Sequence, residues 1–309
     1  YYLAGKNFSQ ALEDADPSEN YSDTPLASLN AFERQLKRFD IKVSGVNADL
    51  VEKFFTTTET AVLFPEFVRL AIQQGIDESI LTDIVAVSTK TQANLLKGFS
   101  ISDATAYSTV TTEGNELPQT NITQGSTASS FNKIGRLITA SYEAVRLERL
   151  DVFAIALKAI GIKLGNAMTK SAVVELSSGT PSIEAAGAEV TYADLVSLYG
   201  EFKDFDMTTI VASPAVVAKI LKLEEMKDAT PQDLKRAVLP FGPVLIKSTQ
   251  IDDSKIIGLD KNYALEMAAS TDLILETDKL IDRQLDKISV SISIAFKKLV
   301  PDAVRMIEF

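Results

Sequence analysis

Residues 150–179 carry the pattern that most constrains the fold, because it predicts one uninterrupted amphipathic helix of unusual length that ends at Gly179. Apolar or small residues recur at steps of three and four, so they share one helix face. About 28 residues at roughly 1.5 Å each give a rod of about 42 Å, longer than most helices of globular proteins. Gly179 and Pro181 then end the helix in the usual way. The predicted buried face consists of Phe153, Leu157, Ile160, Leu164, Ala167, Ser171 and Val174.

Two glycines, Gly161 and Gly165, lie in the middle of this helix, where each costs about 1 kcal/mol relative to alanine. We expect them to form a flat spot against which another backbone packs closely. A membrane span is the rival interpretation of so apolar a segment. Three lysines, an asparagine and a glutamate interrupt it, and the chain has no run of about 20 apolar residues. We therefore predict a half-buried helix and no contact with a membrane.

The composition excludes several chemistries. The chain of 309 residues has no cysteine, hence no disulfide and no thiolate, and no histidine, the commonest general base and metal ligand. Its 31 basic and 42 acidic residues give a net charge of -11, which disfavours binding of nucleic acid through phosphate neutralisation. An acidic wall does suit a container for nucleic acid, because it would not adhere to its contents. We expect no catalytic residue, no metal and no cofactor.

The N-terminal region combines a polar stretch with one helix. Residues 1–24 have no apolar period and predict an extended arm. Thr24-Pro25 is a typical helix start, and the apolar stripe that follows includes Phe32 and Leu36. Residues 44–62 are expected to form a loop.

The next segments predict a short helix and a strand. Residues 67–74 form the helix, which Gly75 should stop, and residues 80–91 are rich in β-branched side chains and predict a strand.

Residues 100–132 differ from the rest of the chain because Ser, Thr, Asn, Gln and Gly dominate and lysine and arginine are absent. Such a segment cannot build a core of its own. Its Thr, Tyr and Val content on both sides of a Glu113-Gly114-Asn115 turn favours a long β-hairpin over disorder. Two strands of about 14 residues at roughly 3.3 Å would reach nearly 45 Å. An arm of that length needs another surface to lie on.

The remaining residues alternate between helix and strand, so the chain as a whole combines helices and strands, and its predicted class is α+β. Residues 192–202 and 215–222 are expected to be helical, and the last segment alternates apolar residues from Ile288 to Phe296 with mild polar ones. The other predicted strands are residues 136–140, 207–212, 244–247, 255–259, 264–270, 271–276 and 303–307.

The order and spacing of these segments resemble the major capsid proteins of tailed bacteriophages, which have the HK97 fold. The resemblance covers most of the chain, and each of its motifs is short and unspecific by itself. The strings that carry it are LFPEFV at 63–68, the strand after the polar loop at 133–142, the long helix, IVASP at 210–214, FGPV at 241–244 and the closing strand at 304–309.

The resemblance implies a division into six segments. Residues 1–60 would be the N-terminal arm, 61–97 and 136–189 the peripheral domain with its spine helix at 150–178, and 98–135 the extended loop called the E-loop. Residues 190–276 would be the axial domain, and 277–309 would return to the peripheral sheet.

The resemblance also implies a structural function without catalysis. Copies would assemble as pentamers and hexamers into an icosahedral shell around double-stranded DNA, in the cytoplasm of a bacterial host. Scaffold, maturation protease, portal and decoration proteins are the further partners it implies. The inter-subunit contact candidates are Phe32, Leu36, Glu113, Asn115 and Glu116.

Two alternatives stay open. An encapsulin-type nanocompartment would keep the fold and hold a cargo enzyme, although the long N-terminal arm favours a phage shell. A carboxylate-based hydrolase would rely on pairs such as Asp252-Asp253, but 42 acidic residues produce such neighbours by chance, and adjacent side chains point to different sides.

Some capsid proteins of this family join subunits by an isopeptide bond between an E-loop lysine and an asparagine, with a glutamate as proton acceptor. This chain has no lysine between Lys97 and Lys133, so the loop lacks the amine. Asn262 and Glu266 resemble the other two partners. We predict a shell without covalent links, in which Glu113 and Glu116 pair with basic residues of a neighbour.

Overall fold

The long helix α7 (Leu150–Ser177) runs through both of the compact units into which the computed structural model divides. The structure describes residues 7–103, 113–114, 117, 119–187, 189–227, 237–280 and 285–309. The predicted division into six segments stays a prediction. Unit 1 consists of Tyr1–Ser79, Ile134–Gly165 and Asp272–Ile292; unit 2 consists of Ile80–Lys133, Asn166–Thr271 and Ser293–Phe309.

The predicted length of α7 is confirmed, but the predicted buried face is right only in its first half. Leu157 and Leu164 are buried as expected, whereas Val174 is 63% exposed. The apolar sequence offers two neighbouring rows of side chains, and periodicity alone cannot choose between them. In unit 2 the helix buries Met168, Ala172, Val173 and Leu176 instead.

By length and composition alone, α7 could cross a membrane, since its most apolar window has a mean hydropathy of 1.4. About a third of that window is buried, and Leu157, Leu164 and Leu176 are among the buried side chains of the helix.

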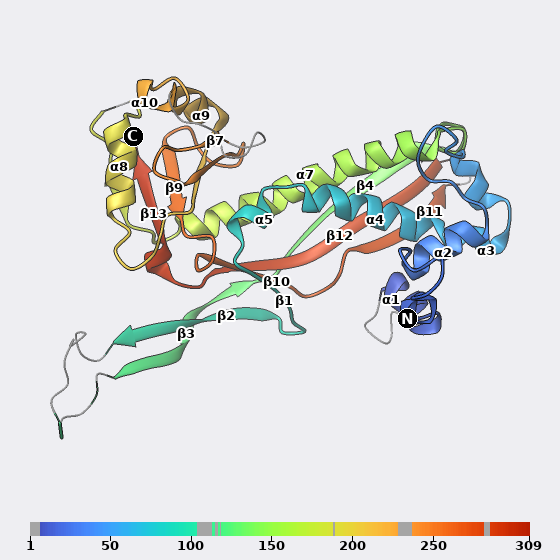
Figure 1. Cartoon of the computed structure of the whole chain (residues 1–309), viewed down its shortest axis with the longest axis horizontal. Helices are drawn as coiled ribbons and strands as arrows, with labels where there is room; N and C mark the ends of the chain where they lie inside the picture. Colours follow the sequence, from blue (N-terminus) through green and yellow to red (C-terminus); the bar gives the residue numbers. More distant parts are fainter. Residues whose placement is uncertain are drawn as a thin grey trace. The chain divides into compact units, whose positions relative to one another are not determined.

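In unit 1, α7 lies beside α4 (Phe64–Asp77) at a glycine contact (Figure 1). A Cβ atom on Gly161 would lie 2.2 Å from the carbonyl oxygen of Ile72, and one on Gly75 would lie 2.1 Å from that of Lys158. The predicted flat spot is therefore confirmed. The predicted stop at Gly75 is wrong, because this glycine permits close packing and the helix continues for two more residues.

The N-terminal region is helical where an extended arm was predicted. Two helical segments precede α2 (Ala31–Arg38), which begins seven residues after the predicted Thr24 start. Asn30 caps α2 in a capping box with Glu33, a stronger start signal than Thr24-Pro25. The elements of residues 7–61 besides α2 are α1 (Phe8–Ala15), η2 (Ser18–Tyr21), η3 (Val51–Phe55) and α3 (Thr58–Ala61), so the loop prediction for 44–62 is also wrong in part.

The rest of unit 1 is a set of strands with one short helix. Strand β11 (Ile274–Leu280) pairs antiparallel with β12 (Leu285–Lys298), and β4 (Asn132–Ser141) also pairs with β12. The alternating C-terminal strand predicted from Ile288 is confirmed as β12, and α6 (Tyr142–Arg146) leads into α7.

Unit 2 contains a six-stranded sheet in the order β5-β13-β9-β6-β8-β7. Its central strand β6 is buried along its whole length, and helices α8 and α9 pack on the core beside it. The predicted strands at 244–247 and 255–259 match β8 and β9. The elements are β5 (Ser182–Glu184), α8 (Tyr192–Gly200), β6 (Thr209–Ala212), α9 (Pro214–Ile220), α10 (Glu224–Lys227), β7 (Ala237–Val238), β8 (Val244–Lys247), β9 (Lys255–Leu259), η5 (Pro301–Ala303) and β13 (Val304–Glu308).

Unit 2 also contains α5 (Leu81–Ile84), β1 (Val87–Lys90) and β10 (Leu265–Ala269). Strand β1 pairs parallel with β10, which pairs antiparallel with the end of β12. The predicted strand at 80–91 is therefore half wrong, since its first half is a helical turn.

Candidate assembly surfaces

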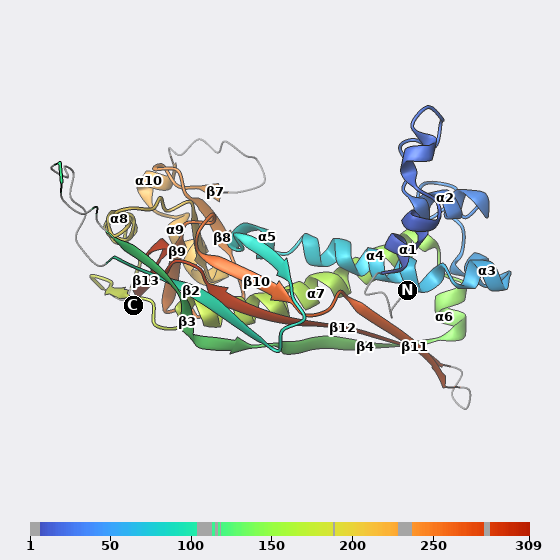
Figure 2. The same ribbon diagram turned by 90° about the horizontal axis from the view of Figure 1, so that it is seen from below.

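The hairpin of β2 (Leu95–Asp103) and β3 (Thr120–Ser130) is a separate two-stranded sheet, which Figure 2 shows as two strands running side by side. At its base, Leu96 is buried against β10 and β12. Beyond the base Phe99 is 42% exposed and Ile122 is 72% exposed. A two-stranded hairpin without a covering layer is marginal in water. The predicted hairpin is confirmed, and most of its described side chains face solvent.

One predicted contact residue, Glu113, lies in the loop that connects the two strands of the hairpin and is exposed to solvent. Glu113 is exposed, and Gly114 follows it with a φ of +88°, a conformation that favours glycine. Leu117 is 77% exposed. Asn115 and Glu116, the other predicted contacts of this loop, lie outside the described residues. The predicted ion pairs with a neighbour stay a prediction.

Close contacts of two glycines hold the base of the hairpin. A Cβ atom on Gly98 would lie 2.9 Å from Cγ of Lys297, and one on Gly125 would lie 3.0 Å from the carbonyl oxygen of Gly98. The strand register shifts between Lys97 and Phe99, next to this contact. The hairpin therefore leaves the sheet at a tightly packed base.

Two lysines of β12 tie that strand to the end of α7 within unit 2. The Nζ atom of Lys297 lies 3.4 Å from the carboxylate of Glu175, and Lys298 donates to the hydroxyl of Thr180 at 2.8 Å and to the carbonyl of Ser178. Burial lowers the pKa of Lys298, nearby Lys297 adds to this, and Glu175 opposes it. Both amines thus contribute to packing within this chain.

A buried guanidinium organises the N-terminal helices of unit 1. Arg34 is 5% exposed and donates to the carboxylate of Asp16 at 3.2 Å, the hydroxyl of Ser18 at 2.9 Å and the carbonyl of Leu29 at 2.8 Å. Its guanidinium carbon also lies 4.5 Å from the centre of the Tyr21 ring. A charge buried in this way is stable only because its donors are satisfied. No sequence pattern had indicated this cluster.

The acids around Arg34 are shifted toward their charged forms. A hydrogen bond from the Tyr21 hydroxyl, and then the Arg34 guanidinium, hold the pKa of Asp16 below its ordinary value. Hydrogen bonds from Ser18 do the same for the pKa of Glu13, whose carboxylate also accepts from the backbone of Ala31 at 3.2 Å.

Phe32 and Leu36, the two predicted contacts on α2, are buried inside their own unit at 4% and 5% exposure. They can therefore act on a second subunit only by fixing the shape of the surface above them, and that role stays a prediction. The arm is also tied to α4, because the Ser9 hydroxyl donates to the buried carboxylate of Glu66, which pairs with Arg69 at 2.7 Å.

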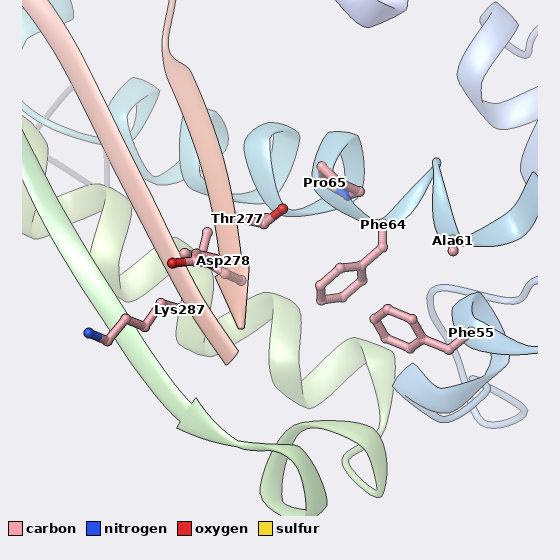
Figure 3. Close-up of a pocket in the computed structure, with 8 residues that line it drawn as sticks. Phe55, Ala61, Phe64, Pro65, Thr277, Asp278 and Lys287 are labelled. Carbon is pink, nitrogen blue, oxygen red and sulfur yellow. The ribbon is translucent and has the colours of Figure 1, made fainter. Parts of the chain in front are cut away.

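A pocket of about 440 Å³ opens in unit 1 beside the first turn of α4 (Figure 3). Its wall includes the rings of Phe55 and Phe64, whose centres lie 5.0 Å apart. Asp278 and Lys287, paired across β11 and β12, line its polar side. The other lining residues are Ala61, Pro65, Thr277 and Ile288.

The described buried carboxylates are engaged in structural contacts rather than in a shared site. Asp194 caps α8, and although burial raises its pKa, hydrogen bonds from Thr191 and Ala186 outweigh burial and leave that pKa below its ordinary value. Asp260 accepts from the backbones of Asp206 and Asn262. In the part of the chain that the structure describes, no three or more acidic side chains gather in a way that could hold a metal ion.

The role of Asn262 and Glu266 as stand-ins for an isopeptide site stays a prediction. The carboxylate of Glu266 accepts the hydroxyl of Thr89 at 2.9 Å, and Asn262 is exposed in the turn before β10.

No family model and no curated protein matches this sequence. Solved structures do match. A virus-like particle from Pyrococcus furiosus gives a TM-score of 0.56 at 15% identity, covering 79% of this chain and 98% of that one. The capsid of an empty GTA particle gives a TM-score of 0.55 at 13% identity, and the match covers 74% of this chain and 89% of that one. The holo-SrpI encapsulin complex from Synechococcus elongatus gives a TM-score of 0.52 at 12% identity, and the match covers 72% of this chain and 84% of that one.

At this level of identity the likeness establishes the fold. The chain has the mixed helix-and-sheet HK97 fold of capsid shells, as the sequence predicted.

Proposed function

We propose that this chain, with its HK97 fold, is a structural protein that assembles as pentamers and hexamers into a closed icosahedral shell around double-stranded phage DNA. The observation that carries the proposal is the β2–β3 hairpin, whose Phe99 and Ile122 side chains, beyond the base, are exposed. A hairpin of this kind gains stability when it lies on a second copy. Covering Ile122 would contribute about 2 kcal/mol per subunit.

The location and partners follow from the same proposal. The shell would be part of a virion, assembled in the bacterial cytoplasm, with scaffold, protease, portal and decoration proteins as partners and no enzymatic activity of its own. The net charge of -11 suits a wall that does not bind its DNA tightly.

Electron microscopy with light scattering on the purified chain tests assembly. We expect closed particles at moderate salt, and weaker assembly as ionic strength falls, because subunits of like charge repel over a longer screening length. A chain that stays monomeric at every concentration and salt would refute the proposal.

A hairpin variant tests the contact itself. Ile122→Ser should reduce assembly without lowering the thermal midpoint of the unassembled chain, because its side chain is exposed there. Ile122→Val is the matched control, since it keeps most of the apolar surface. Equal assembly of all three proteins would show that the hairpin is not an inter-subunit contact.

A second candidate function, an encapsulin-type compartment with a cargo protein, is favoured by the likeness to the SrpI encapsulin. The absorbance ratio at 260 and 280 nm distinguishes the two, because particles filled with DNA absorb more strongly at 260 nm. Particles that contain a second protein and no DNA would favour the compartment.

A further inference from the structure

In unit 1, the face of α7 opposite its contact with α4 is apolar and exposed. Val152 is 48% exposed, Ile155 67% and Ile162 37%, and the side chains of Ala156 and Ala159 between them are also exposed. At about 100° per residue these side chains fall within roughly one third of the helix circumference, and they extend over about 15 Å of its length. A continuous apolar stripe of this kind on a helix is typical of an interaction surface. We refer to these five residues as the exposed stripe.

Two lysines without an ion pair border the exposed stripe. Lys158 and Lys163 lie about 140° apart around the helix axis, and the valine and both isoleucines of the stripe fall in the arc between them. Neither amine forms an ion pair with another residue in the described part of the chain. Asp151, the one acidic residue of α7 in unit 1, is already paired with Arg149 at 2.7 Å. The stripe is therefore bordered by positive charge, although the net charge of the chain is -11.

The shape of the stripe suits a second helix. Ile155 and Ile162 form a ridge, and Ala156 and Ala159 form a shallow row beside it. Large side chains of a partner helix can pack over the alanines, in the way that the ridges of one helix fill the grooves of another. A membrane surface suits the stripe less well, because alanine contributes little apolar area. Duplex DNA also suits it less well, because phosphates bind lysines but gain nothing from isoleucines.

We propose that the exposed stripe binds an amphipathic helix of a separate protein, with large apolar side chains over Ala156 and Ala159 and acidic side chains beside Lys158 and Lys163. A second copy of α7 is not the partner, because pairing of two stripes would place lysines against lysines. The inference concerns one face of a single chain, so it holds whether or not that chain assembles into the proposed shell.

Fluorescence anisotropy with the full chain tests the chemistry of the partner. The probe is a labelled helical peptide with leucines on one face and glutamates on both borders of that face. The control peptide has lysines in place of the glutamates. The measurement is made at low ionic strength, which strengthens ion pairs and weakens the proposed assembly.

We expect saturable binding of the acidic peptide, at least ten-fold tighter than binding of the basic peptide, and weaker binding as the salt concentration rises. This order is the reverse of what the net charge of -11 alone would produce. No saturable binding of the acidic peptide, or equal binding of the two peptides, would overturn the proposal.

Variants of the full chain locate the site. Ile155→Ser should weaken binding of the acidic peptide about ten-fold, because the isoleucine loses its apolar contact with the partner. Lys163→Glu should weaken it about five-fold, because an attraction becomes a repulsion. The matched controls are Val174→Ser, 63% exposed on the same helix in unit 2, and Lys222→Glu, also exposed in unit 2. Neither control should change binding, and equal losses in the controls and in the stripe variants would overturn the proposal.

Further measurements distinguish other occupants of the stripe. A DNA duplex and vesicles of anionic lipid are tested in place of the peptide. We expect neither to bind more tightly than the acidic peptide. Tighter binding of either one, with the same dependence on Ile155 and Lys163, would overturn the helix assignment in favour of that partner. A change in the oligomeric state of the chain alone on Ile155→Ser would overturn it in favour of a second copy.

Discussion

The glycine contact between α4 and α7 makes a strong prediction about the stability of unit 1. In Gly161→Ala, the added Cβ atom would lie 2.2 Å from the carbonyl oxygen of Ile72 and 2.8 Å from the Cα atom of Gly75. Both are backbone atoms, which cannot rotate away, so the two helices must separate by about 1 Å. A gap of that size forfeits up to about half of the dispersion energy of the contacts it opens.

The magnitude follows from two opposing effects. Overpacking of this kind costs about 1–3 kcal/mol, and a clash with backbone belongs at the upper end. Alanine has an intrinsic advantage over glycine of about 1 kcal/mol in a helix. We therefore expect Gly161→Ala to lower the free energy of unfolding by about 2 kcal/mol, and to lower the midpoint by about 4–8 °C.

Thermal unfolding followed by circular dichroism measures this change. Gly200→Ala is the control, because Gly200 is also helical, as the last residue of α8, and a Cβ atom there would have nothing within 4 Å. Its midpoint should be unchanged or slightly higher. Gly165→Ala should be intermediate, since its closest atom is Cβ of Ser79 at 2.5 Å. A midpoint of Gly161→Ala at or above that of the parent would refute the steric argument.

Three further predictions concern the arm and the shell. Arg34→Lys should open the arm to proteolysis, because lysine cannot reproduce the forked donors, while the control Arg38→Lys on the exposed side should not. The pKa values of Asp16 and Glu13 are lowered in the folded chain, so the stability that these carboxylates contribute is present above about pH 4 and is lost as the pH falls further. Faster hydrogen exchange of the α1 and α2 amides at low pH would show this loss. Particles boiled in SDS should run as one band near 33.6 kDa, and a ladder of multimers would contradict the non-covalent shell.

Long-period patterns were predictable from the sequence. The helix at 150–177 and the alternating strand from Ile288 repeat one rule over many residues, so local exceptions do not change the assignment. The hairpin was predictable from its composition, because residues 100–132 have too few apolar side chains to build a core of their own. The strands Val244–Lys247 and Lys255–Leu259 were bounded by turn residues and matched closely.

The arm was misread because its structure depends on contacts between distant residues. Arg34 is in a polar-looking helix, yet its side chain is buried by partners 16 and 18 residues earlier, and no periodicity reveals such a pairing. The same reason explains why Phe32 and Leu36 were predicted to be inter-subunit contacts although they are buried. Their stripe was correctly identified, but the sequence could not indicate that they would be buried within their own unit.

Gly75 was misread because a glycine inside a helix and a glycine after a helix look alike in sequence. The geometry of the contact between α4 and α7 provides an experiment that distinguishes these two roles. Gly75→Ala places its Cβ atom 2.1 Å from the carbonyl oxygen of Lys158, and Gly161→Ala places its Cβ atom against Ile72, so each variant demands the same separation of α4 and α7. Once the helices have moved apart for one methyl group, the second costs little. We therefore expect the double variant to lose clearly less stability than the sum of the two single losses, with an interaction energy of about 1 kcal/mol or more in urea unfolding. If Gly75 acted as a local helix stop, its effect would be independent of Gly161, and strict additivity would establish that interpretation instead.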